Sequence, residues 1–400
     1  MFRTLRLACV ATGLALAPLP VLAGPECHNG QSFEQWLASV RAEAKAAGIK
    51  PVAIEEALAT VHFDESVIKR DRGQGVFQQT FLQFSEHRAS ADQVARAKRA
   101  LSQNASLFNR VEKQYGVPGE VLVAFWALES DYGTDHGKYP ILSATASLAY
   151  DCRRSEVFHT EFLDAIRLVE RGDLQPSQMV GDWAGELGHM QISPPQYVKY
   201  GVDFDGDGRS DIINSLPDAM ATAANFLVGL GWKRGEPWLQ EVRLPASLPW
   251  EEADLNIQHP RSYWVKLGVS ATSGNLPADG LAASLSLPMG RNGPAFLAYP
   301  NFQAYLGWNK SFVYSTTAAY LATRIAGAPP VSKGSPVASL GSPELKELQT
   351  ILVRQGFSTD TPDGRLGTDT RVAVKKAQLK LGLPADGYPT MELLQRLRGK

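Results

Sequence analysis

Hydrophobic residues recur at helical spacing through most of the chain before residue 230. Phe33, Trp36, Leu37 and Val40 fall on one face of a run that ends at Gly48, the pattern of an amphipathic helix with a glycine at its C-terminus. The same spacing predicts further helices over 51–60, 76–87, 91–115, 156–170, 217–230 and 312–325. The bulk of the chain is therefore predicted to be helical.

Two residues indicate where predicted helices begin. Ser90 precedes the run 91–115 and has a side chain suited to cap it. Pro118 suits the first turn of an apolar helix that leads to residue 129, because a first-turn residue needs no backbone N–H.

The pattern changes between residues 237 and 300. Proline and glycine become frequent, and short β-prone runs appear at 239–244, 263–269 and 281–287. This segment predicts a small β-rich insertion (237–300) within a mainly α, α+β protein.

The last part of the chain is predicted to be a separate unit. Residues 327–342 have the proline, serine and glycine content of a linker. Residues 343–400 contain three helical stripes, at 345–352, 372–381 and 391–397, with Asp-Gly turns between them. We expect a three-helix domain that can be separated from the rest and acts as a tether.

Composition narrows the class of protein. The chain has 400 residues, is 44% hydrophobic and 20% charged, and carries a formal net charge of -1. These values are ordinary for a globular protein with one large and one small domain. No basic tract alternates with aromatic residues, so a nucleic-acid partner is not expected.

The first 23 residues have the features of an export signal. Arg3 and Arg6 precede an apolar run, and Val21-Leu22-Ala23 fits a cleavage site before Gly24. The run is too short for a transmembrane helix, so a periplasmic protein without a transmembrane segment is expected, and a monomer. Cys27 and Cys152 would remain in an oxidising compartment, either as a disulfide or as two free thiols.

Glu129 is the most informative residue in the chain. It ends an apolar run, and Phe125 and Trp126 lie one turn before it on the same helix face. A carboxyl held against aromatic surface tends to stay protonated, as a general acid for glycoside cleavage must be. A surface glutamate near a helix end would explain this segment equally well.

Three motifs in order carry a resemblance to a known family. Glu129, the Gly-x-x-Gly-x-x-Gln stretch that ends at Gln191 and the acidic loop 203–209 together resemble the lytic murein transglycosylases, in particular the membrane-bound lytic transglycosylase B family. The resemblance covers about residues 32–327. It implies a lysozyme-like helical catalytic domain over 24–326. The final unit, 343–400, resembles the peptidoglycan-binding domain.

The resemblance also implies a reaction. The family cleaves the β-1,4 bond between N-acetylmuramic acid and N-acetylglucosamine in peptidoglycan and leaves a 1,6-anhydromuramyl end. A single glutamate, here Glu129, would act first as acid and then as base, with no cofactor and no essential second carboxylate nearby. A hydrolytic muramidase and a non-catalytic peptidoglycan-binding protein are the alternatives.

By the same resemblance, seven residues are expected to bind substrate: Arg153, Arg154, Met190, Gln191, Trp308, Asn309 and Tyr314. The arginines would meet the muramyl carboxyl and the peptide stem, because a guanidinium binds carboxylates in a bidentate manner. One of them could instead only pair with Asp151 or Glu156. Met190 could be plain core, Gln191 could be structural and Asn309 could be a helix N-cap.

The acidic loop matches the start of an EF-hand calcium loop. Asp203, Asp205 and Asp207 alternate, Gly208 stands at the sixth position and Arg209 would offer its carbonyl. Asn214 replaces the usual closing glutamate, and the resemblance places the last carboxylate at Asp218. A structural calcium ion is expected, with an Asp/Gly turn that holds no metal as the alternative. Asp182 lies near the motif and is predicted to be a helix N-cap or to form a salt bridge within the loop, in preference to being a second carboxylate near the groove.

Overall fold

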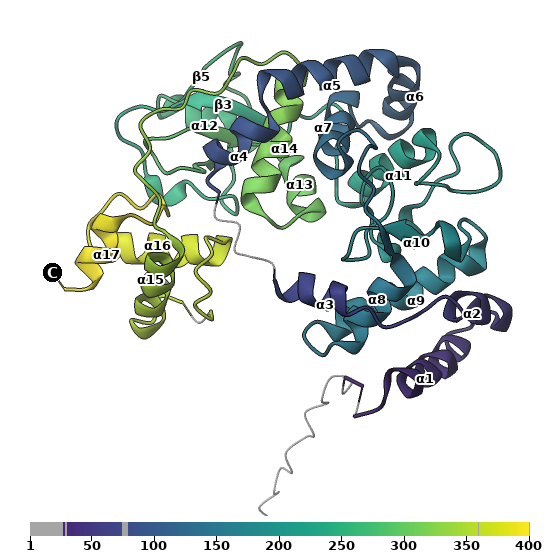
Figure 1. The fold of residues 1–400 in the computed structure, drawn as a ribbon. Coiled ribbons are helices and arrows are strands. Elements are labelled where there is room, and N and C mark those ends of the chain that lie inside the picture. The colour runs from purple at the N-terminus through teal and green to yellow at the C-terminus, as the bar shows by residue number, and fades with distance from the viewer. Residues whose placement is uncertain (1–26, 29, 74–78, 359, 400) are drawn as a thin grey trace, which may run out of the picture.

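The computed structural model describes residues 27, 28, 30–73, 79–358 and 360–399, and Figure 1 shows its elements. The α-helices of this part of the chain are α1 (Phe33–Ala46), α2 (Pro51–Leu58), α3 (Glu65–Arg72), α4 (Phe81–Arg88), α5 (Ala91–Gln103), α6 (Ala105–Tyr115), α7 (Gly119–Ser130), α8 (Ile141–Tyr150), α9 (Ser155–Arg171), α10 (Pro194–Tyr200), α11 (Leu216–Gly229), α12 (Arg261–Lys266), α13 (Phe302–Trp308), α14 (Phe312–Ile325), α15 (Ser342–Arg354), α16 (Thr368–Lys380) and α17 (Met391–Leu397). The strands are β1 (Tyr139–Pro140), β2 (Val180–Gly181), β3 (Leu239–Arg243), β4 (His259–Pro260), β5 (Ser270–Ala271), β6 (Ala282–Ser286) and β7 (Phe296–Ala298). The predicted mainly α fold is confirmed.

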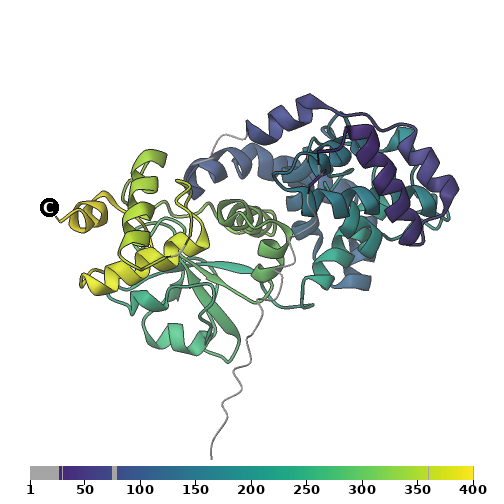
Figure 2. The ribbon, with the colours of Figure 1, turned by 90° about the horizontal axis from the view of Figure 1, so that it is seen from below.

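The molecule has two ends joined by a helix. Helices α5 to α11 gather at one end, whereas the larger sheet and the C-terminal helices lie together at the other (Figure 2). Helix α14 lies between them and packs on both α7 and β3.

Helix α7 is the centre of the helical core. Nine of its twelve residues are buried, which is why the segment reads as apolar on every side. It ends where Asp131, Tyr132 and Gly133 adopt consecutive left-handed conformations, so the chain turns sharply after Glu129. Pro118 is the N-cap of this helix and not a residue of its first turn, a shift of one position from the prediction.

The predicted helix 91–115 is wrong as a single element. It breaks at Asn104, which is both the C-cap of α5 and the N-cap of α6. The Asn104 side chain donates from Nδ2 to the carbonyl of Ala100 (3.0 Å) and so competes with helical continuation. Ser90 caps α5 as predicted, through Gln93 N at 3.2 Å. Of the predicted helix 76–87, residues 76–78 lie outside the described residues, residues 79 and 80 are not helical, and α4 accounts for the rest.

The β-rich segment forms an antiparallel five-stranded sheet in the order β4-β6-β7-β3-β5. The runs 239–244 and 281–287 are strands β3 and β6 as predicted, but 263–269 begins as helix α12. The reason is tertiary: the fully buried Trp264 donates from Nε1 to the carbonyl of Ala283 (2.9 Å), and this packing overrides the β propensity of its aromatic neighbours.

The C-terminal helices α15, α16 and α17 surround their own small core, which includes Leu348, Val374 and Leu393. The segment before them, 327–341, has no helix or strand. It is nevertheless held to the rest of the protein: Ser332 N donates to Glu241 (2.8 Å) and Lys333 pairs with Glu86 at 2.5 Å. The segment that leads to the C-terminal unit is thus fixed to the rest of the protein by a hydrogen bond and an ion pair.

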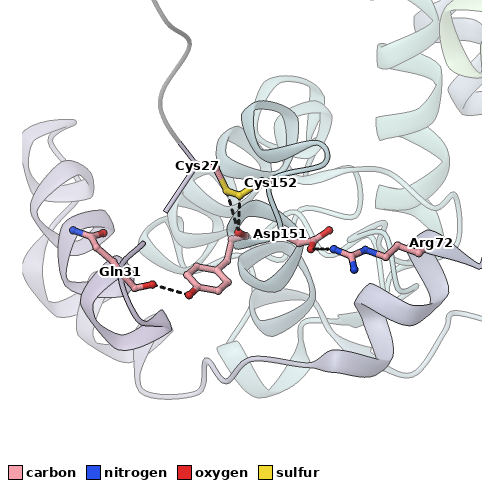
Figure 3. Close-up of a disulfide and its surroundings, with 6 residues drawn as sticks. Cys27, Gln31, Arg72, Asp151 and Cys152 are labelled. Atoms are coloured by element: carbon pink, nitrogen blue, oxygen red, sulfur yellow. Dashed lines mark hydrogen bonds and ion pairs between the residues drawn. A yellow bond between two sulfur atoms is a disulfide. The ribbon is translucent and has the colours of Figure 1, made fainter. Parts of the chain in front are cut away.

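A disulfide joins Cys27 to Cys152 across 125 residues (Figure 3). It links the start of the described chain to the turn between α8 and α9, where Asp151 also pairs with Arg72. Of the two states left open by the sequence, the bonded one is present.

Within the described residues, no helix is long and apolar enough to cross a membrane. The predicted signal 1–23 lies outside the described residues.

Candidate active site

Glu129 is held by two aromatic hydrogen-bond donors from distant parts of the chain. The indole Nε1 of Trp308 donates to Glu129 Oε1 at 2.9 Å, and the hydroxyl of Tyr314 donates to the same oxygen. The Trp308 ring stacks on Phe125, with 4.4 Å between ring centroids. The carboxyl therefore has a fixed orientation, with Oε2 left free of these two bonds.

The surroundings of Glu129 raise its pKa from 4.5 to about 7. Burial among apolar side chains is the largest cause, because it penalises the charged form. The hydrogen bonds from Tyr314 and Trp308 act in the opposite direction, and the charges of Asp182 and Arg88 have smaller opposing effects. A carboxyl with this pKa can both give and accept a proton near neutral pH.

The loop 181–193 lies against the end of α7. Ser130, next to Glu129, donates from Oγ to the carbonyl of His189 at 2.6 Å. Gly188 of this loop has a φ of +70°, and a Cβ there would lie 2.3 Å from the carbonyl oxygen of Ile212. Only glycine fits this position without displacing the backbone, which explains the second glycine of the Gly-x-x-Gly stretch.

Further carboxyls lie near Glu129. Asp182 accepts hydrogen bonds from the backbone N–H groups of Ala184 (2.8 Å) and Glu186 (2.9 Å) and so organises the loop. These bonds are neither the helix N-cap nor the salt bridge that the sequence predicted. Its charge also contributes to the raised pKa of Glu129. Burial, followed by the charge of Asp182, raises the pKa of Glu186 well above its ordinary value. The site thus holds neighbouring acids that are themselves driven toward the neutral form.

Two predicted substrate residues are engaged within the protein. Met190 is fully buried in the hydrophobic core, so its predicted place on a substrate-contacting surface is wrong and the core alternative holds. Gln191 adopts a φ of +45°, and its side-chain Nε2 donates to the carbonyl of Gly188 at 2.9 Å. That bond supports the alternative that Gln191 is structural, at least for its side-chain NH2 group, which is already used within the protein.

The segment 308–314 arranges the start of α14. Ser311 is the N-cap of this helix and accepts from Tyr314 N at 3.3 Å, so the assignment of Asn309 as the N-cap is wrong. Asn309 instead ends α13 and accepts from Ser311 N through Oδ1 at 2.9 Å. The side chains of Asn309 and Ser311 thus support the position of Tyr314.

Arg153 and Arg154 converge on one buried carboxylate, Asp71 of α3. Arg153 Nε donates to Asp71 Oδ2 at 2.6 Å, and Arg154 pairs with Oδ1. Burial acts to raise the pKa of Asp71, but the two guanidinium groups outweigh it and hold the pKa below its usual value. The predicted alternative partner Asp151 pairs with Arg72 instead. The two arginines therefore form one preorganised cationic pair.

The acidic loop brings carboxylates together as a cation site requires. Oxygen atoms of Asp203, Asp205 and Asp218 lie within 4.8 Å of one another. Asp218 is fully buried and accepts from the backbone N–H groups of Phe204 (2.7 Å) and Asp205 (3.2 Å), which closes the loop. Asp207 is outside this cluster and accepts from the N–H of Arg209 at 2.9 Å. Three of the four predicted carboxylates thus fit a hard cation such as calcium.

Comparison with known proteins places this geometry in a family. The transglycosylase SLT domain matches residues 32–323, and the putative peptidoglycan binding domain matches residues 341–397. The chain belongs to the transglycosylase SLT domain family. It is 30% identical over 234 residues to membrane-bound lytic murein transglycosylase B of Escherichia coli (strain K12). This match covers 56% of this chain and 62% of that protein. The chain thus spans less than two thirds of that curated relative.

Solved structures extend this likeness over nearly the whole chain. The crystal structure of SltB3 from Pseudomonas aeruginosa in complex with NAG-anhNAM-pentapeptide is 39% identical, with a TM-score of 0.86, and covers 92% of this chain and 100% of that one. The Escherichia coli lytic transglycosylase Slt35 in complex with calcium is 25% identical, with a TM-score of 0.62, and covers 75% and 94% of the two chains. The predicted lysozyme-like transglycosylase fold is confirmed.

Two of the carboxyls described above were not predicted from the sequence. Asp71 lies in a charged segment, Lys69-Arg70-Asp71-Arg72, where nothing distinguishes a buried carboxylate from an exposed one. Glu186 lies inside the Gly-x-x-Gly-x-x-Gln stretch, and this position in a recognised motif could have marked it as a carboxyl near Glu129.

Proposed function

We propose that this chain is a lytic transglycosylase that cleaves the β-1,4 bond between N-acetylmuramic acid and N-acetylglucosamine in peptidoglycan. Family membership supports the class of reaction, and the SltB3 complexes with NAG-anhNAM-pentapeptide and NAG-NAM-pentapeptide support the substrate. The single observation that carries the assignment is Glu129, fixed by Trp308 and Tyr314 and with a pKa near 7.

In the proposed reaction, Glu129 starts protonated. It gives its proton to the oxygen of the leaving N-acetylglucosamine as the bond to the muramyl anomeric carbon breaks. The muramyl 6-hydroxyl then bonds to that carbon and gives its proton to Glu129. No water is consumed and the acid is restored, so one carboxyl is sufficient. The bonds from Trp308 and Tyr314 stabilise the carboxylate that exists between the two steps.

The remaining assignments form part of the same proposal. Arg153 and Arg154 bind the carboxylates of the muramyl group or the peptide stem, as a pair aligned by Asp71. The acidic loop holds a structural calcium ion through Asp203, Asp205 and Asp218, supported by the convergence of their oxygens. Residues 1–23 direct export to the periplasm, residues 24–326 form the catalytic domain and residues 343–400 bind peptidoglycan.

The decisive test is mass spectrometry of the products from purified peptidoglycan. Intramolecular capture by the 6-hydroxyl gives 1,6-anhydromuramyl ends, each lighter by one water than a hydrolysed end. The Glu129→Gln variant, purified in the same way, controls for contaminating enzymes. Reducing muramic acid ends as the main product would assign a hydrolytic muramidase instead. No cleavage by the wild-type protein would leave only a peptidoglycan-binding role.

A further inference from the structure

The C-terminal unit contacts the same helix that holds Glu129 through Tyr314. Arg371 of α16 reaches out of this unit, and its guanidinium carbon lies 4.9 Å from the centroid of the Phe312 ring. Phe312 is the first residue of α14. The colours of Figure 2 show the C-terminal helices beside the green helices that include α14. The contact therefore falls on the first turn of α14.

Arg371 is anchored as well as close. Its terminal nitrogens donate to the carbonyl oxygens of Leu287 (3.2 Å) and Pro288 (2.8 Å), which follow strand β6. On the side of its own unit, the ring of Tyr388 has its centroid 5.7 Å from the guanidinium carbon. Burial lowers the pKa of Arg371 to about 10, so the side chain is still charged at neutral pH. A half-buried cation between two aromatic rings and two carbonyls is a directional contact.

From Phe312 the structure leads directly to the candidate catalytic carboxyl. Phe312 and Tyr314 share the first turn of α14, which Ser311 caps by accepting from Tyr314 N. The Tyr314 hydroxyl donates to Glu129 Oε1. A displacement of this turn moves the ring that Arg371 contacts and the hydroxyl that Glu129 accepts from at the same time.

A second anchor of the C-terminal unit avoids α14. Lys375 of α16 donates from Nζ to the carbonyl of Ala253 (3.0 Å) and to Asp254 Oδ2 (2.7 Å). Between the two anchors remains a cavity of about 50 Å³, lined in part by Ser286, Phe312 and Arg371. Since the interface is incompletely packed there, the polar anchors set how the unit docks.

We propose that Arg371 is a positioning residue for the transglycosylase reaction: by docking the C-terminal unit on Phe312, it fixes the first turn of α14 and so the Tyr314 hydroxyl on Glu129. The inference rests on the proposed function, in which Glu129 is the acid and base. It gives the C-terminal unit a part in turnover in addition to any part in retention on the cell wall.

The test compares two variants of the full chain, Arg371→Met and Lys375→Met. Both remove one cation of the same interface, but only the first removes a contact to α14. On short soluble glycan strands, Arg371→Met should lower kcat by roughly threefold to tenfold with KM unchanged, and Lys375→Met should leave kcat within about twofold of wild type. Equal kcat values for wild type and both variants would overturn the proposal.

The titration of Glu129 gives a readout that needs no activity. Its protonated carboxyl band in infrared difference spectra, identified by its absence in Glu129→Gln, should persist to higher pH in Arg371→Met. The reason is that the hydrogen bond from Tyr314 favours the charged carboxylate. In a Tyr314→Phe background the Arg371 substitution should add no further shift. A full additional shift there would refute the route through Tyr314.

The two proposals fail in distinguishable ways. A wild-type protein that does not cleave peptidoglycan refutes the proposed function, whereas the infrared titration still decides whether Arg371 positions the Glu129 site. Should Arg371→Met fail to fold, Phe312→Leu removes the same contact from the catalytic side and leaves the core of the C-terminal unit intact. An unchanged Glu129 titration in folded Phe312→Leu would then overturn the positioning role.

Discussion

Replacing Glu129 by Gln separates the chemistry of this residue from its structural role. The amide oxygen of Gln can still accept from Trp308 and Tyr314, so the hydrogen bonds at 308–314 are retained. The proton that the leaving oxygen requires is lost. Glu129→Gln should therefore lose at least about 10² in rate on peptidoglycan, the usual contribution of a general acid and base.

The same substitution predicts a change in how stability depends on pH. The folded protein raises the pKa of Glu129 from 4.5 to about 7, which at about 1.4 kcal/mol for each pH unit corresponds to about 3 kcal/mol. Because the folded pKa is the higher one, this stabilisation is fully present below pH 4.5 and is lost as pH rises through about 7. In Glu129→Gln the side chain does not titrate, so its free energy of unfolding should not show this decrease with rising pH.

The measurement is urea unfolding of both proteins at about pH 4 and about pH 8.5, followed by tryptophan fluorescence. The free energy of unfolding of wild type relative to Glu129→Gln should fall by about 3 kcal/mol between these two conditions. Other titrating groups are common to both proteins and largely cancel, except Glu186, whose pKa is raised in part by the charge of Glu129. If the difference between the two proteins is the same at both pH values, Glu129 is an ordinary exposed carboxylate and the reasoning is wrong.

A matched variant tests whether one carboxyl is sufficient. Burial and the charge of Asp182 raise the pKa of Glu186 well above its ordinary value, which favours its neutral form. Glu186→Gln replaces a carboxyl that favours the neutral form by a neutral amide and should retain activity within about tenfold of wild type. A loss as large as that of Glu129→Gln would mean that the reaction uses two carboxyls.

Three further predictions follow from individual contacts. Tyr314→Phe removes a donor that lowers the pKa of Glu129, so the alkaline limb of the kcat profile should move to higher pH; an unmoved limb would contradict that role. Calcium at a hundredfold excess over its Kd should stabilise the wild type by about 3 kcal/mol, seen as a higher melting temperature than in chelator, but should not stabilise Asp205→Asn. Asp71→Asn should raise KM for glycans that carry peptide stems by roughly tenfold and leave KM for peptide-free glycans unchanged; equal effects on both would assign Asp71 a purely structural role.

How far the sequence predicts this fold depends on the surroundings of each element. Amphipathic segments such as 33–47 and 156–170 were predicted because one face meets water and the other the core, which leaves a helical period. Helix α8 was missed because nine of its ten residues are buried, and a segment buried on every side shows no such period. Helix α12 was predicted as a strand because its aromatic residues favour strands where no tertiary contact decides.

The candidate site was predictable where the chemistry lies in a local motif. Glu129 and Tyr314 were both named from the sequence, but the bond between them joins positions 185 residues apart, and only the fold shows it. Trp308 was expected to bind substrate, and the structure shows in addition that its indole N–H donates to Glu129. The docking of Arg371 was not predicted, because the linker composition of 327–342 predicts a separable unit but gives no information on which surface that unit contacts.

A single carboxyl that acts as acid and then as base needs a pKa close to the working pH, since either extreme disables one of the two steps. In this structure two opposing influences meet that requirement. The buried end of α7 favours the protonated form, and the donors Trp308 and Tyr314 favour the charged form. The donors come from the end of α13 and the first turn of α14, 179 and 185 residues after Glu129 in the sequence. The balance can therefore be shifted by whatever moves α14, and this is why a contact of the C-terminal unit at Phe312 bears on the chemistry of Glu129.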